Sequence, residues 1–449
     1  MRVLGRPSGV KASRTRWGRL VAGLAVVTLL ATACGSGSGA ESAGITDPTG
    51  TPNGDGEKLT VWIMEGTNPD PKPYVDELKT AFKKETGADL DVQFVQWAEA
   101  HDKFVSAIAG GTTPDVAEVG TTWTPEFAEA GGLIDLSEAV KKSGLESDLV
   151  PGLVEAGTID GKLYGMPWYA GVRSVIYRTD VFKKAGVEPP TTWDELVQAG
   201  EKIKAAFPKM ITFPVPGDSE YGVDPFIWGA GGDIATEKDG TWSSGVDSAA
   251  AQKGISFYTG LATEHGFSSP AATTWDEADL SDAFSRGQVA MMISGSWTPG
   301  ALIDANPDLK GKIGAFPIPG PDGGMSPSFL GGSHLGIFET AKDKNLAWAL
   351  VRMMTTGEFA QKWSEQSGFF PGTKSLLKKV QQQNDPLVAP FAKQMSEAGA
   401  SLPVTELYGQ IQGKKTMAAM LESILSKKKS VADATKDAAA EMDDIFSKG

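Results

Sequence analysis

Aromatic side chains in loops are the residues of this sequence whose chemistry is easiest to recognise. The chain contains 12 Trp and 7 Tyr, and several of them stand where a predicted strand or a Gly-rich turn ends. A Trp or Tyr ring buries a large apolar area at low entropic cost and keeps a polar group for hydrogen bonding, which suits a binding site for a small molecule. The loop aromatics that we consider candidates for such a site are Trp97, Trp123, Trp168, Tyr169, Tyr221 and Trp297.

Polar side chains near the same predicted loops could add hydrogen bonds to a ligand. Glu65 follows the first predicted strand and Thr122 follows the third. His334 ends a Gly-Gly-Ser-His run and could face a cleft, although a single His is more often a structural residue. By contrast, Trp193 and Trp275 each belong to a Thr-x-x-Glu sequence. This is the pattern of a capping box at a helix start, so we expect both Trp residues to be structural.

A catalytic site would need other arrangements of residues. A glycoside hydrolase uses two carboxylates about 5–5.5 or 6.5–9.5 Å apart, and with 56 Asp and Glu residues the sequence leaves a secreted glycoside hydrolase open as the alternative function. The nucleophile motifs are incomplete, because residues 331–335 lack the last Gly of a nucleophile elbow and Ser375-x-x-Lys378 lacks its partner motifs. One Cys and three distant His residues argue against a metal site. We therefore expect a binding protein, not an enzyme, with no cofactor or metal; a pure scaffold or adhesion protein would not need the loop aromatics.

The elements that must position these residues alternate between strand and helix. Residues 58–64, 90–95 and 115–119 have the apolar content of buried strands, and the segments between them have apolar residues at helical spacing. Strand, helix, strand, helix, strand predicts a parallel α/β sheet. Ligands bind such sheets at the carboxyl ends of the strands, where the loops contain Glu65, Trp97, Thr122 and Trp123. The length of 449 residues exceeds the roughly 250–300 that one hydrophobic core supports, so two lobes or domains are expected.

The N-terminus has the pattern of a secretory signal. Residues 1–33 contain six Lys or Arg, no acidic residue and an apolar run too short to span a membrane, so we predict a signal peptide. Its end, Leu30-Ala31-Thr32-Ala33-Cys34, resembles a bacterial lipobox, in which the Cys is diacylated after cleavage. Residues 34–57 are rich in Gly, Ser, Thr, Pro and Asp, so we expect a flexible tether. Removing residues 1–33 changes the formal net charge from −14 to −20, which makes nucleic acid an improbable partner.

Several motifs resemble those of one known family in their order and spacing. They include Pro114-Asp115-Val116, Ala-Gly-Gly-Leu-Ile-Asp-Leu at 130–136 and Gly-Lys-Leu-Tyr-Gly-Met-Pro at 161–167 leading into Val-Ile-Tyr-Arg-Thr-Asp at 175–180. Further matches lie at 189–196, 284–291, 295–297 and 347–348. Together, over roughly Lys58 to Phe370, they resemble the family 1 extracellular solute-binding proteins of ABC importers, of the maltose-binding type.

This resemblance implies a fold, a ligand and partners. The fold would be α/β with two lobes, each a mainly parallel sheet flanked by helices and joined by a hinge. A carbohydrate would bind in the cleft and pass to a membrane permease, whose ATPase is a separate chain because no P-loop motif is present here. Trp297 occupies the position of a sugar-stacking aromatic in the family. The candidate site has no basic cluster, so we expect a neutral sugar, and several aromatics favour an oligosaccharide.

The resemblance also implies lobe boundaries. The chain would cross between the lobes near 169–171, 315–317 and 371–372, so the N-terminal lobe would comprise 58–170 and 316–371, and the C-terminal lobe 171–315 and 372–449. The protein would be a monomeric lipoprotein, anchored through Cys34 to the outer face of the cell membrane.

Overall fold

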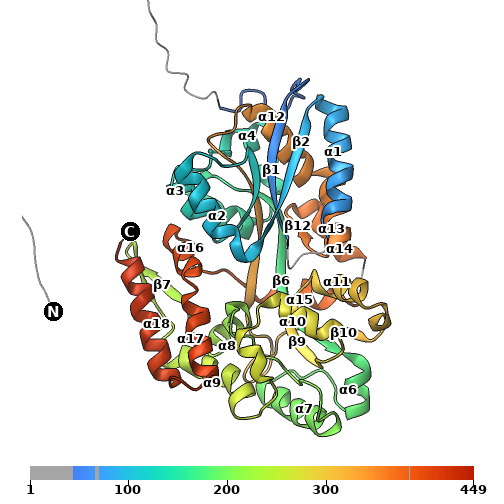
Figure 1. Cartoon of the computed structure of the whole chain (residues 1–449), viewed down its shortest axis with the longest axis vertical. Helices are drawn as coiled ribbons and strands as arrows, with labels where there is room; N and C mark the ends of the chain where they lie inside the picture. Colours follow the sequence, from blue (N-terminus) through green and yellow to red (C-terminus); the bar gives the residue numbers. More distant parts are fainter. Residues whose placement is uncertain (1–43, 66–69, 384, 449) are drawn as a thin grey trace, which may run out of the picture. The chain divides into compact units, whose positions relative to one another are not determined.

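The computed structural model describes residues 44–65, 70–383 and 385–448, all within one compact unit of the chain. These residues form a mixed α/β fold with two lobes (Figure 1), which confirms the predicted fold class. None of the described helices is long and apolar enough to span a membrane. The predicted signal peptide, Cys34 and the first ten residues of the predicted tether lie outside the described residues.

The first lobe begins with the alternation that the sequence predicted. Strands β1 (Lys58–Glu65), β2 (Asp89–Gln96) and β3 (Val116–Gly120) are parallel neighbours, with β1 in the middle. Helices α1 (Lys72–Thr86) and α2 (Trp97–Gly110) connect them. Because the three strands run in the same direction, their last residues, Glu65, Gln96 and Gly120, lie at one edge of the sheet.

One long strand passes from the first lobe into the second. Strand β6 (Met166–Arg178) is buried over its first eleven residues, as expected for a strand with both faces covered. Its first half pairs with β11 (Ser328–Ile337) and β12 (Phe370–Pro371), and its second half with β9 (Met291–Gly295) and β10 (Ile313–Phe316). Figure 1 shows β6 passing from the first lobe, drawn above, into the second. These pairings of β6 are all antiparallel, and β11 is also antiparallel to β3. The first-lobe sheet is therefore mixed, with parallel pairing among β1, β2 and β3, and neither lobe has the mainly parallel sheet that was expected.

The other elements complete the two lobes. Those that follow α2 up to the second lobe are α3 (Thr124–Glu129), α4 (Ser137–Lys142), α5 (Pro151–Ala156), β4 (Thr158–Ile159) and β5 (Lys162–Leu163), and α12 (Lys344–Thr355) and α13 (Gly357–Ser367) follow β11. The remaining elements are α6 (Thr179–Ala185), α7 (Trp193–Ala206), α8 (Asp224–Gly229), β7 (Ala235–Lys238), β8 (Thr241–Ser244), α9 (Ala249–Thr263), α10 (Glu277–Ser285), α11 (Thr298–Ala305), α14 (Lys374–Gln382), α15 (Ala389–Ala398), β13 (Gly399–Ala400), α16 (Glu406–Gly413), α17 (Thr416–Leu425) and α18 (Val431–Phe446).

The second crossing between the lobes differs from the expected position. Phe316 and Ile318 pack in the core of the second lobe together with Phe329, whereas Leu335 and Ile337 belong to the core of the first lobe. The chain therefore returns along β11 and not near 315–317. The motif resemblance misplaced the boundary because β10 pairs with the second half of β6 before the chain turns back.

The described part of the predicted tether, residues 44–57, is held against α12. The indole Nε1 of Trp348 donates to the Pro48 carbonyl (2.9 Å), the guanidinium of Arg352 donates to the carbonyls of Pro48 and Gly50, and the amide of Thr46 donates to Asn345 Oδ1 (2.8 Å). The prediction of a flexible tether is therefore wrong for these residues. The polar composition of residues 44–57 gave no sign of this contact, because the side chains that bind them follow about 300 residues later in the chain.

Candidate functional site

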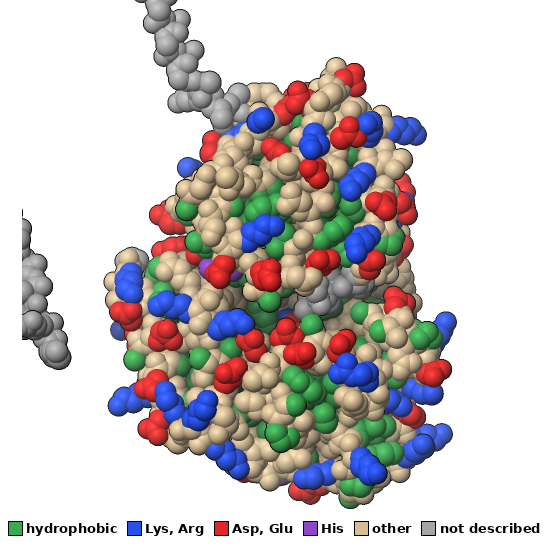
Figure 2. All heavy atoms as spheres, in the orientation of Figure 1, with side chains coloured by type: hydrophobic (Ala, Val, Ile, Leu, Met, Phe, Trp, Pro, Cys, Tyr) green, Lys and Arg blue, Asp and Glu red, His purple; other side chains and the backbone are tan. Residues whose placement is uncertain are grey.

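A cavity of about 420 Å³ lies between the two lobes. Residues of the first lobe, of the crossing strands and of the second lobe all line it. In Figure 2, acidic side chains gather along the second-lobe border of the hollow between the lobes. We call the lining residues Glu65, Trp97, His101, Thr122 and Trp123 the first-lobe wall, and Arg173, Glu220, Tyr221, Glu277 and Gln412 the second-lobe wall.

The first-lobe wall is built on the carboxyl ends of the parallel strands. Trp97 begins α2 directly after β2, and Trp123 directly precedes α3. Their ring centroids are 5.4 Å apart at an interplanar angle of 56°. Gly120, at the end of β3, lies against both rings, since a Cβ at this position would be 3.5–3.6 Å from their atoms. The wall thus presents two adjacent indoles beside Glu65, which accepts a hydrogen bond from Gln96 Nε2 (3.0 Å).

A stack of three aromatic rings lies where the lobes join. The rings of Tyr169 and Trp297 each stack on Phe369, with centroid distances of 4.1 and 4.5 Å. The Trp297 indole also lies against Gly171 and Gly295, where an added Cβ would come within 2.4 and 2.2 Å of it. Trp297 is therefore only 8 % exposed, and most of its surface is covered by protein although it lines the cavity.

The buried carboxyl group of Glu118 holds one ring of this stack, that of Tyr169, by a hydrogen bond. Glu118, on β3, is fully buried and accepts hydrogen bonds from the Tyr169 hydroxyl, from Ser333 Oγ (2.7 Å) and from the Met64 amide (2.8 Å). Burial raises the pKa of Glu118 to about 7, although the three hydrogen bonds act in the opposite direction. Glu118 ties β1, β6 and β11 together and holds the Tyr169 ring in place.

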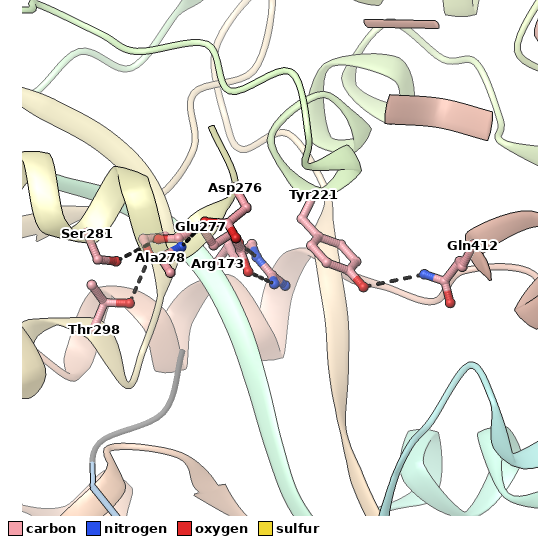
Figure 3. A network of polar contacts seen from close by, with 9 residues as sticks. Arg173, Tyr221, Asp276, Glu277, Ala278, Ser281, Thr298 and Gln412 are labelled. Atoms are coloured by element: carbon pink, nitrogen blue, oxygen red, sulfur yellow. Dashed lines mark hydrogen bonds and ion pairs between the residues drawn. The ribbon is translucent and has the colours of Figure 1, made fainter. Parts of the chain in front are cut away.

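The second-lobe wall is centred on Arg173, whose side chain is 6 % exposed. Its Nε and Nη2 donate to the two carboxylate oxygens of Glu277 at 2.7 and 2.8 Å (Figure 3). Its guanidinium carbon lies 3.9 Å from the Tyr221 ring centroid and 5.3 Å from that of Trp297. Burial opposes the charge on Arg173, but the charge and hydrogen bonds of Glu277, together with smaller effects of Tyr221 and Asp224, outweigh it and raise the pKa of Arg173, so the side chain is a cation.

Two further carboxylates lie around this ion pair. Glu220 accepts hydrogen bonds from Gln412 Nε2 and from the Tyr408 hydroxyl, and burial raises its pKa. Asp224 is fully buried, and its oxygens have no hydrogen-bond partner among the described residues. Burial, reinforced by the Glu220 charge, raises the pKa of Asp224 well above its ordinary value. Desolvation thus favours the neutral form of both groups.

The structure brings together most of the residues proposed from the sequence. The members of that set that line the cavity are Glu65, Trp97, Thr122, Trp123, Tyr169, Tyr221 and Trp297. Tyr221 has Arg173 over one face of its ring and packs almost parallel to Phe329, at an interplanar angle of 8°. The polar contact of the Tyr221 side chain is made by its hydroxyl, which accepts a hydrogen bond from Gln412 Nε2 (3.4 Å; Figure 3).

Two predicted site residues do not line the cavity. Trp168 is 1 % exposed and stacks on Trp363, with ring centroids 5.0 Å apart. Its ring also lies 4.9 Å from that of Tyr169, so Trp168 packs in the first-lobe core behind the residue that lines the cavity. His334 is fully buried and lies within hydrogen-bond distance of Thr124 Oγ1 (2.8 Å) and the Leu153 carbonyl (2.9 Å). Burial lowers the pKa of His334 to about 4. His334 is a structural residue, as a single His usually is.

Sequence reasoning missed the ion pair at the centre of the second-lobe wall. We expected Glu277 to close a capping box with Thr274, but α10 begins at Glu277, and the box is formed by Asp276 and Asp279. Glu277 is therefore available to Arg173. The position of Arg173 inside the otherwise uncharged run from Met166 to Tyr177 was the signal that could have identified it. Among the described residues, no group of three or more His, Cys, Asp or Glu could hold a metal ion.

Comparisons with known proteins agree with this architecture. The diacetylchitobiose binding protein DasA of Streptomyces coelicolor is 27 % identical over 431 residues, which cover 94 % of this chain and 97 % of the relative. The maltotriose-binding protein of Pyrococcus abyssi is 27 % identical and is matched over 74 % of its length, by 76 % of this chain. Among solved structures, an ABC transporter solute binding protein from Thermotoga lettingae, bound with alpha-D-tagatose, superposes with a TM-score of 0.79 at 29 % identity, covering 87 % of this chain and all of that one.

The family comparison covers most of the described fold. The model of the family described as "Bacterial extracellular solute-binding protein" matches residues 66–360. This range contains β2, β3, β6 and β9 to β11, with most of both cavity walls. With about two thirds of its length matched, the chain belongs to the bacterial extracellular solute-binding protein family.

Proposed function

We propose that this chain is the solute-binding component of an ABC importer and that it binds a neutral oligosaccharide between its lobes. The observation that carries this proposal is the composition of one cavity, in which two indoles of the first lobe, Trp97 and Trp123, accompany the hydrogen-bonding groups of Arg173, Glu277 and Gln412. Family membership supports solute binding, and relatives are named for binding diacetylchitobiose and maltotriose.

The two walls match the two kinds of surface that a sugar presents. The C–H groups on one face of a pyranose ring are apolar and pack against an indole, which buries area at low entropic cost. The hydroxyl groups both donate and accept hydrogen bonds, and they can be paired with carboxylates, amides and a guanidinium. A cavity of about 420 Å³ falls within the range typical of small-molecule sites.

The arrangement of the lobes supports a closing mechanism. Strands β6, β11 and β12 connect the lobes, and α16 of the second lobe packs against α3 of the first, with Gly413 against the His101 ring. A sugar that touches both walls has more contacts when the lobes are close together, so it favours the closed arrangement by that difference in affinity. We propose that the permease recognises this closed form and that its ATPase is a separate chain.

The N-terminal part of the proposal concerns anchoring. We propose that residues 1–33 are a signal peptide and that Cys34 is diacylated, so that the protein is attached as a monomer to the outer face of the cell membrane. Two acyl chains give the stable anchoring that a single chain does not. Cys34→Ser should leave the protein unlipidated, either released into the medium or with its signal uncleaved; membrane attachment equal to that of the wild type would contradict the proposal.

A sugar screen tests the proposed binding activity. The chain without residues 1–43 is mixed with diacetylchitobiose, maltotriose, cellobiose and tagatose, and unfolding is followed on heating. A ligand at 100 times its Kd adds about 2.7 kcal/mol to the free energy of unfolding, so the correct sugar should raise Tm clearly. If none of a wide panel of neutral mono- and oligosaccharides does so, the proposal fails.

The hydrolase alternative has its own test. The sugar that stabilises the protein most is incubated with it for days and then analysed by mass spectrometry. We expect the sugar to be recovered unchanged. Cleavage that a single carboxylate substitution abolishes would reassign the protein to the hydrolases.

A further inference from the structure

Acidic side chains outnumber basic ones on the cavity surface. The described lining residues include the cations Arg173 and Lys415, and Lys415 is paired with Asp218 Oδ2 at 2.8 Å. The acidic residues among the described lining residues are Glu65, Asp102, Asp218, Glu220, Asp276 and Glu277, and burial favours the neutral form of Glu220. The cavity surface therefore repels an anionic ligand unless Arg173 can act as an unpaired cation.

Arg173 still has hydrogen atoms to donate after its bond to Glu277. A guanidinium carries five N–H donors, and Glu277 takes one from Nε and one from Nη2. No described residue accepts a hydrogen bond from Nη1. Because Arg173 lines the cavity, these remaining donors are available to an oxygen atom of a ligand.

The positive charge of Arg173, by contrast, is already matched. The Glu277 carboxylate binds it through two parallel hydrogen bonds, the strongest geometry for this pair. The rings of Tyr221, Trp297 and Phe329 surround it at 3.9, 5.3 and 5.9 Å from the guanidinium carbon, which limits the access of water. Glu277 itself is 16 % exposed, so solvent screens the ion pair only weakly.

We infer that Glu277 is a specificity-determining residue of this cavity. By pairing with Arg173 it keeps the guanidinium as a hydrogen-bond donor without net positive charge, so the cavity takes uncharged and amine-bearing sugars and excludes acidic ones, such as uronic acids and sugar phosphates. This inference rests on the proposed function, because it names the class of sugar that the proposed site accepts. It assigns the selection to one ion pair and not to the shape of the cavity.

Two matched sets of probes test the sugar class on the wild-type protein. Calorimetry compares cellobiose with cellobiouronic acid, which has one carboxylate in place of a hydroxymethyl group, and diacetylchitobiose with its amine form, chitobiose. We expect the acidic sugar to bind at least about tenfold more weakly than its neutral counterpart, the usual effect of one uncompensated charged hydrogen-bonding group. The amine form should bind no more than about threefold more weakly than diacetylchitobiose. The inference would be overturned if cellobiouronic acid bound as tightly as cellobiose.

A variant of Glu277 tests the residue itself. Glu277→Gln removes one negative charge at constant size and leaves Arg173 as an unpaired cation, so it should bind cellobiouronic acid at least about tenfold more tightly than the wild type does. The matched control is Asp282→Asn, which removes the same charge from the exposed face of the same helix and should change nothing. Equal affinity of Glu277→Gln and wild type for the acidic probe would overturn the assignment.

Inorganic sulfate separates this inference from the proposed function. Sulfate at low millimolar concentration should change the Trp fluorescence of Glu277→Gln saturably, because Trp297 lies beside Arg173, and should change neither the wild type nor Asp282→Asn. The double variant Glu277→Gln with Arg173→Gln should lose the response. If no sugar binds but sulfate behaves in this way, the proposed function fails and the role of Glu277 stands. If sulfate changes the Trp fluorescence of Glu277→Gln no more than that of the wild type, the role inferred for Glu277 is wrong, even if the protein binds sugars. If Glu277→Gln does not fold, the comparison of acidic and neutral sugars on the wild-type protein still tests whether the cavity excludes acidic sugars.

Discussion

The two walls of the cavity are built in different ways. The first-lobe wall is formed by residues at or shortly after the ends of the parallel strands β1, β2 and β3, and its main surfaces are the indoles of Trp97 and Trp123. The second-lobe wall combines residues from β6, from the segment before α8, from α10 and from α16, and its centre is an ion pair. Under the proposed function, the first-lobe wall would supply apolar area for binding and the second-lobe wall polar groups for selection, so a ligand would need both lobes.

The largest expected effect comes from breaking the second-lobe wall at its centre. Arg173→Ala leaves the Glu277 carboxylate without its partner in a largely buried position, which should lower the free energy of unfolding by about 3–5 kcal/mol. Urea unfolding measures this change. The control is Arg286→Ala, whose exposed ion pair with Asp282 should contribute less than about 1 kcal/mol. A comparable loss in both variants would mean that the Arg173 pair has no special structural role.

The stability of the protein should depend on pH through Glu118, a buried residue of the first lobe that is not part of the first-lobe wall. Because burial raises the pKa of Glu118 to about 7, the folded state keeps a proton that the unfolded state loses near its ordinary pKa of 4.5. This group therefore stabilises the fold below pH 4.5, and the contribution is lost as the pH rises to about 7, by roughly 3 kcal/mol in total.

Urea titrations of wild type and Glu118→Gln from pH 4 to pH 8 check this expectation. The difference in unfolding free energy between the two proteins should change with pH in the direction given above, because Gln does not titrate. The two curves would stay parallel if Glu118 had the same pKa in the folded and unfolded states.

The indoles of the first-lobe wall should affect binding more than folding. Trp123→Ala should weaken sugar binding by about 1–3 kcal/mol, because it removes one of two adjacent stacking surfaces. Calorimetry with the tightest sugar from the screen measures the loss. A Trp228→Ala variant serves as a control, since Trp228 packs against the second-lobe core and does not line the cavity. Unchanged affinity in a folded Trp123→Ala protein would show that the first-lobe wall does not stack on the sugar.

The smallest expected effect distinguishes the ring of Tyr221 from its hydroxyl. Tyr221→Phe keeps the ring beneath Arg173 and removes only the hydroxyl that accepts from Gln412 at 3.4 Å. Binding should weaken by about 1 kcal/mol or less, the net contribution of one hydrogen bond. A loss of several kcal/mol would mean that this hydroxyl contacts the sugar directly and that the second-lobe wall contributes more to affinity than the comparison suggests.

The sequence by itself determined the parts of the molecule that depend on local pattern. Apolar periodicity predicted β1, β2 and β3, and the direction of parallel strands then placed Glu65, Trp97, Thr122 and Trp123 at one edge of the sheet, where the structure has them. These inferences succeed because the direction of a strand and the side-chain period are properties of a few consecutive residues.

Tertiary structure alone decided the second-lobe wall and the accessibility of each aromatic ring. Arg173 and Glu277 are 104 residues apart in the chain, and nothing in either local sequence specifies the other. Trp297 has the loop position of a ligand-binding aromatic, yet Phe369, Gly171 and Gly295 cover most of it. Burial and ion pairing depend on which distant segments meet when the core packs, and a sequence pattern of a few residues does not contain that information.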